Sequence, residues 1–390
     1  MFTDFVLNGV AHGDVSEQLA ECRFDPGMLR PYFDSQGKRC VTINTGRRVY
    51  DNKAGVYIPE VKRVEIAELL SHGISSPVIN ATSLRKEEWI NLDAQVVRAA
   101  RERLRAWSDL AAVSSFGGFN AMSKMILEHE TMSDAGEAVV DMDGLTDART
   151  DSPAFQLEGV PLPMTHSDFW FSSRRLAVSR NSGTPLDTTM PEMAGRRVAE
   201  SIEKTLIGTV VGKTYGGAST QIGGYGRAST VYGYTNFGPR LTKTDLTAPT
   251  GSNAATTLAE VLEMRDLLTA NRFYGPFMLY HSADWDQYLD NDYVLTGGNV
   301  ATQTLRDRLR SIEGIQDVRR LDFFTDEFSL LMVQMTSEVA RAIDGMPITI
   351  VQWESSGGLR LNFKVMAIQV PQLRADYNGR TGICHASVAA

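Results

Sequence analysis

Four aspartates crowd one short segment in the C-terminal half of the chain, and their type and spacing could support chemistry. They are Asp284, Asp286, Asp290 and Asp292. Carboxylates this close together could hold a metal ion or act as a general acid and base. The same spacing, with Trp285 and Tyr288 as apolar anchors, fits the solvated side of a short helix. We favour the helix and keep an enzyme that uses these aspartates as an alternative.

A second acidic stretch, DMDGLTDARTDSP over residues 141–153, could be taken for a calcium-binding loop. Such a loop needs glycine at its sixth position and glutamate at its twelfth. Counted from Asp141, Gly144 is fourth and Ser152 is twelfth. The stretch is therefore predicted to be an exposed loop tip rather than a metal site.

Two glycine-rich fragments invite a nucleotide-binding interpretation. The first, GTVVGKT over residues 208–214, has three residues between its glycines where a phosphate-binding loop has four. A helix, not a strand, is predicted before it. The second, GGYGRAS over residues 223–229, lacks the strand–turn–helix setting of a dinucleotide site. Neither fragment predicts a bound nucleotide.

The remaining polar residues form no catalytic or metal signature. The histidines occur singly, without HxxxH or HxH spacing: His12, His72, His129, His166, His281 and His385. The chain has no GxSxG nucleophile elbow. Cys22, Cys40 and Cys384 are odd in number and lack CxxC spacing, so we interpret them as reduced, apolar side chains. We predict no cofactor, no metal and no enzymatic activity.

The elements that must position these residues centre on the stretch from Val160 to Gly208. Apolar and polar residues alternate from Phe169 to Val178, as in a half-buried strand. After possible N-caps at Thr188 and Thr189, a helix of about five turns is predicted, because small and apolar residues recur on one face. That face carries Gly195, Ala199, Ile202 and Leu206, and the polar face carries Arg196, Arg197, Glu200, Glu203 and Lys204.

A second helix is predicted over residues 85–112, with an apolar stripe along one side. The stripe consists of Leu92, Val96, Ala100, Leu104 and Trp107. Its arginine-rich face could contact nucleic acid, but the acidic residues between the arginines favour a solvated, ion-paired surface. The formal net charge of −8 also argues against a broad nucleic-acid-binding face.

Beyond residue 253, predicted helices and strands alternate. The helices cover 256–273 and 302–312, the strands cover 275–281, 318–324 and 329–336, and the block 346–388 is rich in strands. In that block a turn at Ser355–Gly358 precedes four apolar residues on one strand face, namely Leu359, Leu361, Phe363 and Val365.

The N-terminal part reads as an irregular, extended arm with short strands. A hairpin is predicted around Ser35–Gly37, and residues 64–70 could form one or two helical turns. The chain of 390 residues is long enough for two domains. No run approaches the 18 apolar residues of a membrane span, and the N-terminus lacks the basic region of a signal peptide, so we expect a cytosolic product.

Residues 120–165 carry the main physical argument for assembly. Segments 137–142 and 154–163 are predicted strands of a two-stranded ribbon. Such a ribbon has no third layer to bury its apolar face and is unstable alone, so we expect it to lie across another subunit. The tyrosine- and glycine-rich segment after residue 208 is also typical of a contact surface. The candidate subunit-contact residues are Glu137, Val139, Met142, Phe155, Leu157, Tyr225, Tyr232 and Tyr234.

The order and spacing of one set of residues resemble the tailed-bacteriophage major capsid proteins and the encapsulins, which share the capsid fold first seen in phage Hong Kong ninety-seven. The pattern is a "PLP…HSDF…R-L…SR…G…LD" strand and loop, followed by a long helix that ends in glycine. The matching positions are Pro161, Pro163, His166, Asp168, Phe169, Arg174, Arg175, Leu176, Ser179, Arg180, Gly183, Leu186, Asp187, Ala194, Arg197, Ala199, Glu203 and Gly208. Phe277, Leu279, Trp285 and Tyr288 take the places of the family's axial-domain motifs.

The resemblance, which covers about residues 85–390, implies an α+β phage major-capsid fold with a long spine helix, an extended β-ribbon loop, and peripheral and axial domains. It implies the following division: 1–84, N-terminal extension; 85–112, N-arm helix; 113–180, extended loop; 181–250, peripheral domain with the spine helix; 251–345, axial domain; 346–390, C-terminal strands that return to the peripheral domain.

The function implied is that of a major capsid protein, a non-enzymatic subunit that self-assembles into an icosahedral shell around phage double-stranded DNA. Its partners would be copies of itself in hexamers and pentamers, a portal and other virion proteins, and enclosed DNA without sequence-specific contact, but no membrane. It would be assembled in the host bacterial cytoplasm and end in the virion. An encapsulin-type compartment around a cargo enzyme is the alternative. Deletion of residues 130–160 is predicted to leave a folded subunit that cannot close shells.

Overall fold

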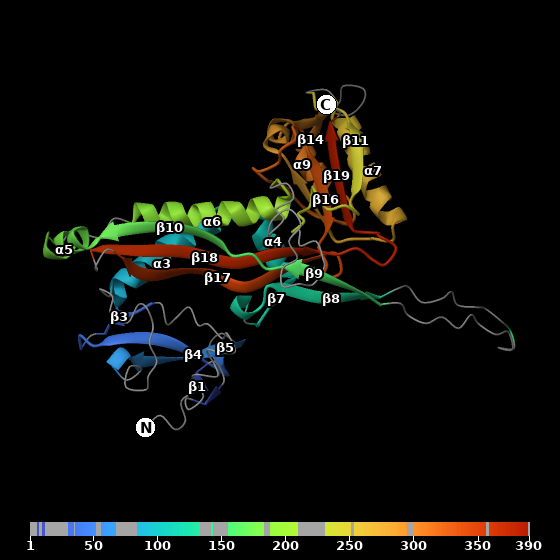
Figure 1. Cartoon of the computed structure of the whole chain (residues 1–390). Helices are drawn as coiled ribbons and strands as arrows, with labels where there is room; N and C mark the ends of the chain where they lie inside the picture. Colours follow the sequence, from blue (N-terminus) through green and yellow to red (C-terminus); the bar gives the residue numbers. More distant parts are fainter. Residues whose placement is uncertain are drawn as a thin grey trace.

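The computed structural model describes residues 6–7, 10–11, 30–34, 36–51, 56–67, 84–119, 121–132, 142, 155–182, 188–209, 231–250, 253–294, 300–355 and 359–388. Its largest element is a long sheet in the order β10-β18-β17-β7 (Figure 1). β10, β18 and β17 are antiparallel, and β7 runs parallel to β17. The strands are β7 (Ser115–Gly117), β10 (Thr165–Ser172), β17 (Ala340–Ser355) and β18 (Arg360–Leu373).

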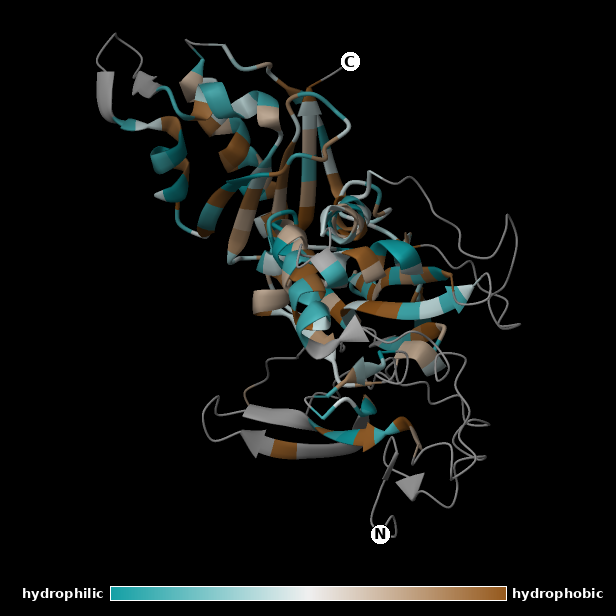
Figure 2. Ribbon diagram, turned by 90° about the vertical axis from the view of Figure 1, so that its left-hand side faces the viewer, coloured by the Kyte–Doolittle hydropathy of each residue, from teal (hydrophilic) through white to brown (hydrophobic). Residues whose placement is uncertain are grey.

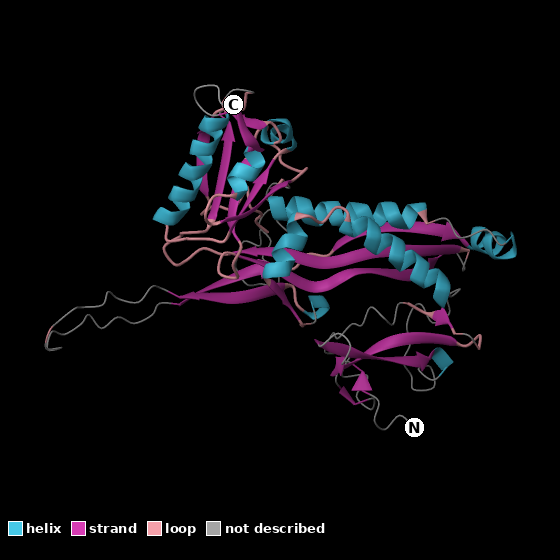
Figure 3. Cartoon of the chain, turned by 180° about the vertical axis from the view of Figure 1, so that it is seen from behind, coloured by secondary structure: helices cyan, strands magenta, loops and turns pink. Residues whose placement is uncertain are grey.

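Helices cover one face of this long sheet. α6 packs on β10 and β18, and α3 packs against α6 and crosses the strands obliquely (Figure 3). α4 follows α3 and contacts both α6 and β17. These helices are α3 (Lys86–Arg101), α4 (Ala106–Val113) and α6 (Thr189–Ile207).

The core between helices and sheet is aromatic and tightly packed. Phe169 of β10 stacks on Phe363 of β18 with 5.1 Å between ring centroids. Gly195 of α6 faces α3 at such short range that an added Cβ would lie 2.9 Å from Val96 Cγ1. A larger side chain would push the two helices apart, so the small residue sets their separation.

A second sheet of five strands stands at one end of the long sheet, in the order β11-β19-β16-β12-β15 (Figure 1). Its first and second strands pair in parallel although they are far apart in sequence. Hydrophobic residues gather in its strands (Figure 2), and α7 and α9 contribute buried side chains to the same core. The strands are β11 (Leu241–Leu246), β12 (Phe277–His281), β15 (Ile315–Arg320), β16 (Leu330–Gln334) and β19 (Ile383–Val388).

Short elements complete this second unit. They are α7 (Ala254–Ala270), η5 (Ala283–Trp285), α8 (Asp286–Leu289), β13 (Asp292–Val294), β14 (Val300–Thr304) and α9 (Leu305–Arg310). The alternation of helix and strand predicted beyond residue 253 is confirmed, with Val261, Leu268, Leu305 and Leu309 buried.

The N-terminal region contains a sheet in the order β5-β4-β3-β6. The hairpin predicted around residue 36 is confirmed by the antiparallel pairing of β3 and β4. The prediction of an irregular arm is wrong for the long pair β4 and β5, and Val64 and Glu65 lie in β5 rather than in a helical turn. The elements are β1 (Val6–Leu7), β2 (Val10–Ala11), β3 (Tyr32–Phe33), β4 (Arg39–Asp51), β5 (Val56–Glu65) and β6 (Leu84–Arg85).

The strand predicted over residues 169–178 is wrong after Ser172. β10 ends there because its partner β18 begins at Arg360, the residue paired with Ser172, so no further backbone groups are available for pairing. The hydroxyl group of Ser172 accepts a hydrogen bond from the backbone N–H of Arg175 (3.2 Å) at the start of α5 (Ser173–Ser182). Leu359 also differs from the prediction: it lies outside β18 and is 72% exposed.

The helix predicted over residues 85–112 is two helices, α3 and α4, separated by residues 102–105. No glycine or proline occurs at the break. The cause is a tertiary contact. The carboxylate of Glu203, on α6, accepts hydrogen bonds from the N–H groups of Ala106 (2.6 Å) and Trp107 (3.1 Å). It thereby caps a new helix start at Ala106.

Candidate subunit-contact surfaces

A two-stranded ribbon is present as β8 (Ile126–Met132) and β9 (Phe155–Pro161), which pair in antiparallel register. β9 confirms the strand predicted over residues 154–163. The other predicted strand, 137–142, lies outside the described residues except for Met142, and the sequence did not predict β8. The two strands leave the body as a narrow ribbon (Figure 1). Leu127 and Val160, opposite each other at its base, pack against a small buried cluster of the long sheet. The ribbon is therefore anchored at one end, and no third strand pairs with it among the described residues.

One face of the ribbon carries exposed apolar and acidic side chains. Phe155 is 62% exposed and Leu157 is 39% exposed. Because side chains alternate along a strand, these two residues share a face, and the register places Glu130 opposite Leu157 on the same face. Glu130 is also exposed. Large apolar side chains left in water on a thin ribbon indicate a surface that a partner covers.

The opposite face of the ribbon base is electrostatically unusual. His129 lies 3.5 Å from Glu158 (Nε2 to Oε2), yet neither ring nitrogen has a hydrogen-bond partner among the described residues. Burial lowers the pKa of His129, and the positive charge of Arg374 lowers it further, against the opposing effect of Glu158. Burial and the charge of Arg374 thus favour the neutral form of His129.

The structure separates the predicted contact residues into three groups. Met142, Phe155, Leu157 and Tyr232 are exposed, with Met142 100% and Tyr232 45% exposed. Glu137, Val139 and Tyr225 lie outside the described residues. Tyr234 is fully buried in the core of its own chain, which removes it from the candidates. It is buried because the chain returns to α6 there: the N–H of Tyr234 bonds to the carbonyl oxygen of Leu206 (2.8 Å).

Sequence reasoning missed Glu203. The helix pattern placed it on the polar, solvated face of α6, but it is 1% exposed. Burial raises its pKa to about 7, although the N–H groups of Ala106 and Trp107 oppose the shift. No local signal marks the partner, because residues 102–105 (ERLR) are all strong helix formers.

Arginines pair with two members of the aspartate cluster, Asp286 and Asp290. Asp286 lies 3.0 Å from Arg306 and 2.8 Å from Arg320, and Asp290 lies 2.8 Å from Arg306. Burial alone would raise the pKa of Asp286, but hydrogen bonds from the two arginines outweigh it and the pKa lies below its ordinary value. Asp284 accepts from the hydroxyl group of Ser282 (3.2 Å). Among the described residues, no group of His, Cys, Asp and Glu could hold a metal ion.

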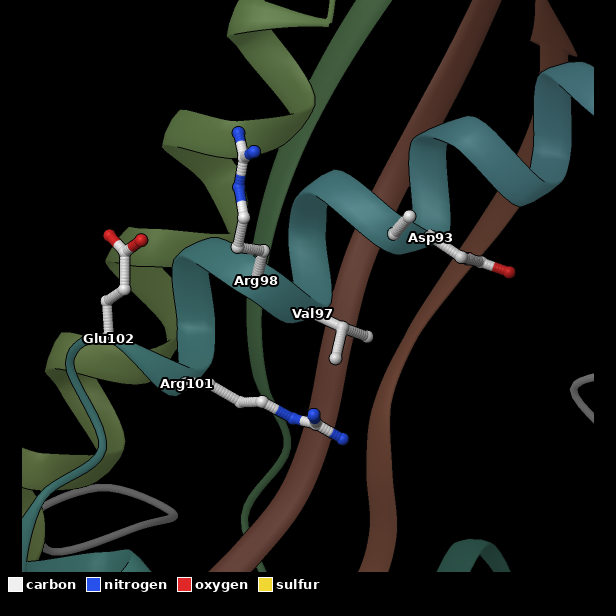
Figure 4. A pocket seen from close by; sticks show the side chains of 6 residues that line it. Asp93, Val97, Arg98, Arg101 and Glu102 are labelled. Carbon is white, nitrogen blue, oxygen red and sulfur yellow. The ribbon is translucent and has the colours of Figure 1, made fainter.

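A shallow depression of about 580 Å³ lies on the outer side of α3. Its floor is Ala94 and Val97, and Figure 4 shows charged side chains around it. Arg98 and Glu102 project on the side of α6, whereas Arg101 projects away from it. This arrangement confirms the expected mixture of charges on this helix face. Among the helices that the structure describes, none is both long and apolar enough to cross a membrane.

Comparisons with known proteins identify the family and the fold. A family model described as a family of unknown function (DUF6260) matches residues 79–386. No curated protein has a sequence that matches this chain. A virus-like particle from Pyrococcus furiosus is similar in structure, with 14% identity over 77% of this chain and 99% of that chain and a TM-score of 0.50. The structure of Mycobacterium phage Bobi is similar with 11% identity over 72% of this chain and 90% of that chain, and a TM-score of 0.51.

The first of these structures is a virus-like particle and the second is from a phage, and at these identities they establish the fold alone. The capsid resemblance inferred from the sequence is confirmed at that level. The chain belongs to the family of unknown function DUF6260 and has the α+β capsid fold.

Proposed function

We propose that this chain is the structural subunit of a closed protein shell. The observation that carries the proposal is the ribbon of β8 and β9, which packs on the body at its base through Leu127 and Val160 and presents Phe155 and Leu157 to solvent. In a single copy Phe155 and Leu157 leave 62% and 39% of their surface in water. Covering that remaining area against a second copy is worth about 1 kcal/mol for each residue, since full burial of such a side chain contributes about 1.5–3 kcal/mol. Repeated around a closed symmetric assembly, such contacts make a durable container.

The specific form that we propose is the major capsid protein of a tailed bacteriophage or prophage. Its shell is icosahedral, built of hexamers and pentamers, and encloses double-stranded DNA without sequence-specific contact. A portal and other virion proteins are the further partners. The division into N-arm, extended loop, peripheral domain and axial domain belongs to this proposal, and the family motifs in the sequence support it. So does the capsid fold.

A second candidate is an encapsulin-type compartment that encloses a cargo enzyme. The observation that favours it is the similarity to the Pyrococcus furiosus particle over 99% of that particle's chain. Neighbouring genes separate the two candidates. Terminase and portal genes beside this gene support the phage shell, and a gene for a cargo enzyme supports the compartment.

Negative-stain electron microscopy of the purified chain, after size-exclusion chromatography, tests the proposal. The expected result is elution at the size of a large assembly and closed particles of uniform diameter. A chain that stays monomeric at every salt and protein concentration overturns the proposal. It would also revive the alternative of a soluble enzyme.

A further inference from the structure

The outer side of α3 carries an apolar stripe that stays exposed in the folded chain. Ile90 is 56% exposed and Val97 is 37% exposed, and Ala94 between them is exposed as well. The other side of the helix is buried against α6 and β17, so α3 is apolar on two sides. The stripe runs through the floor of the shallow depression on α3, and Figure 4 shows Val97 and Arg101 projecting away from α6. An exposed apolar stripe on a helix indicates a surface that a partner covers.

The spacing of the stripe is that of a helix that packs lengthwise against another helix. Its exposed residues recur three and four positions apart in turn, at Glu87, Ile90, Ala94, Val97 and Arg101. This is the seven-residue repeat of paired helices, in which side chains of one helix fit between those of the other. Ala94 stands at the middle, where a small side chain lets two helices approach closely. The stripe therefore fits a helical partner better than an extended one.

The two ends of the stripe carry opposite charges. Glu87 and Arg101 lie seven residues on either side of Ala94, and both are exposed. Neither side chain forms an ion pair with another described residue. The same polarity extends over the whole helix, with Glu88 also in the first turn and Arg98 also in the last. A helix that is acidic at its start and basic at its end is complementary in charge to a second copy of itself that runs in the opposite direction.

We propose that this stripe of α3 is a two-fold seam between two copies of the chain, in which the helices lie antiparallel and cross at Ala94. Ile90 of one copy packs against Val97 of the other, and Glu87 of one copy pairs with Arg101 of the other. Each contact occurs twice, because the same surface serves both copies. The apolar spacing, the small central residue and the two unpaired end charges all fit this one arrangement.

The inference rests on the proposed shell and adds a contact of a different kind from the ribbon. A closed icosahedral shell has two-fold axes, and across each of them the same surface of two copies must meet. A helix of 16 residues is about 24 Å long. A seam of that length falls well short of the roughly 1,200 Å² that a stable interface buries. The seam therefore joins copies that other contacts already hold in place, and the free subunit should not dimerise through it.

Cysteine cross-linking in assembled particles tests the two-fold geometry. Ala94→Cys places a thiol beside the axis in both copies, so oxidation with copper phenanthroline should give a disulfide-linked dimer on a non-reducing gel. Ile90→Cys should give none, because its two thiols lie about 12 Å apart along the helices, beyond the reach of a disulfide. Ile90→Cys combined with Val97→Cys should link again. Wild-type particles, in which Cys40 and Cys384 are buried, give the background.

Charge reversal tests the same seam without cysteines. Glu87→Arg or Arg101→Glu sets like charges against each other, so the concentration needed for assembly should rise at least about threefold in light scattering. The double variant restores opposite charges and should assemble near the wild-type concentration. Both changes oppose the helix dipole, so recovery in the double variant can come only from pairing between copies. Glu313→Arg, at an exposed site on the five-stranded unit, is the matched control and should assemble as wild type does.

The outcomes separate this inference from the proposed function. Intact particles in which Ala94→Cys links no more than Ile90→Cys overturn the seam and leave the shell standing. The seam is equally overturned by a charge-reversed double variant that assembles no better than the single variants. A wild-type chain that forms no particles overturns the shell and the seam together.

Discussion

Single residues decide how the long helix ends. α6 stops at Gly208, whose φ of +99° is open to glycine and strained for other residues. The returning chain passes so close that an added Cβ on Gly233 would lie 2.4 Å from both Gly208 N and Thr205 O. Neither atom can move without disturbing α6, because both belong to the backbone. The contact also brings Tyr234 into the core.

Gly233→Ala should therefore destabilise the chain by about 2–4 kcal/mol, measured as the free energy of unfolding in urea. Gly238, five residues later, has no atom within 4 Å of an added Cβ. Gly238→Ala is the control and should change stability by less than about 0.5 kcal/mol. Equal stability of the two variants would contradict the close approach.

The buried carboxylate of Glu203 should also leave a signature in global stability. Its folded-state pKa of about 7 lies above the ordinary value of 4.5. The contribution to stability is therefore fully present below pH 4.5 and is lost as pH rises through 7. Between pH 5 and pH 8 the loss is about 2–3 kcal/mol. Urea unfolding of wild type minus that of Glu203→Gln isolates this slope, and a difference that does not vary with pH would contradict it.

For whole helices and strands, a periodic apolar pattern predicts the element correctly where the segments packed against it leave its ends unchanged. The apolar face of α6 is buried as its spacing predicts, with Ala199 and Ile202 at 0% and 1% exposure. The 85–112 helix was equally periodic, yet it breaks because Glu203, 97 residues from Ala106, caps a new start. The strand over 169–178 ends early because β18 offers no further partner. Such outcomes depend on residues far away in the chain.

The ribbon gives a prediction at the same scale. Phe155→Ser together with Leu157→Ser should leave the circular dichroism spectrum of the subunit unchanged, since neither side chain is buried in its own chain. The concentration needed for assembly should rise at least about tenfold, because apolar area is lost from each contact. Light scattering, recorded as a function of protein concentration, measures the concentration at which assembly begins. Tyr274→Ser, at a site that is 71% exposed on the five-stranded unit, is the control. An equal rise in the assembly concentration of both variants would contradict the assignment of the ribbon as a contact surface.

At the scale of the whole molecule, the ribbon is separable from the body except at its base. Leu127 and Val160 pack on the buried cluster beneath them, so removing residue 160 would damage the body as well as the ribbon. Replacing residues 130–157 by a two-residue Asn-Gly turn links the paired residues His129 and Glu158, keeps the base and shortens the hairpin. This variant should unfold with wild-type cooperativity and remain small on size-exclusion chromatography. Closed particles seen by electron microscopy would refute the assembly role of the ribbon.

Residues close together in the chain suffice to predict the strongly periodic helices and strands, the second strand of the ribbon and the capsid resemblance. They do not suffice to place the first ribbon strand at Ile126–Met132, to pair β11 with β19, or to bury Tyr234 and Glu203, which depend on the tertiary structure. The physical reason is the distance along the chain between the residues that interact. Periodicity records which side of an element is apolar, whereas burial, capping and strand pairing depend on which distant segment arrives there.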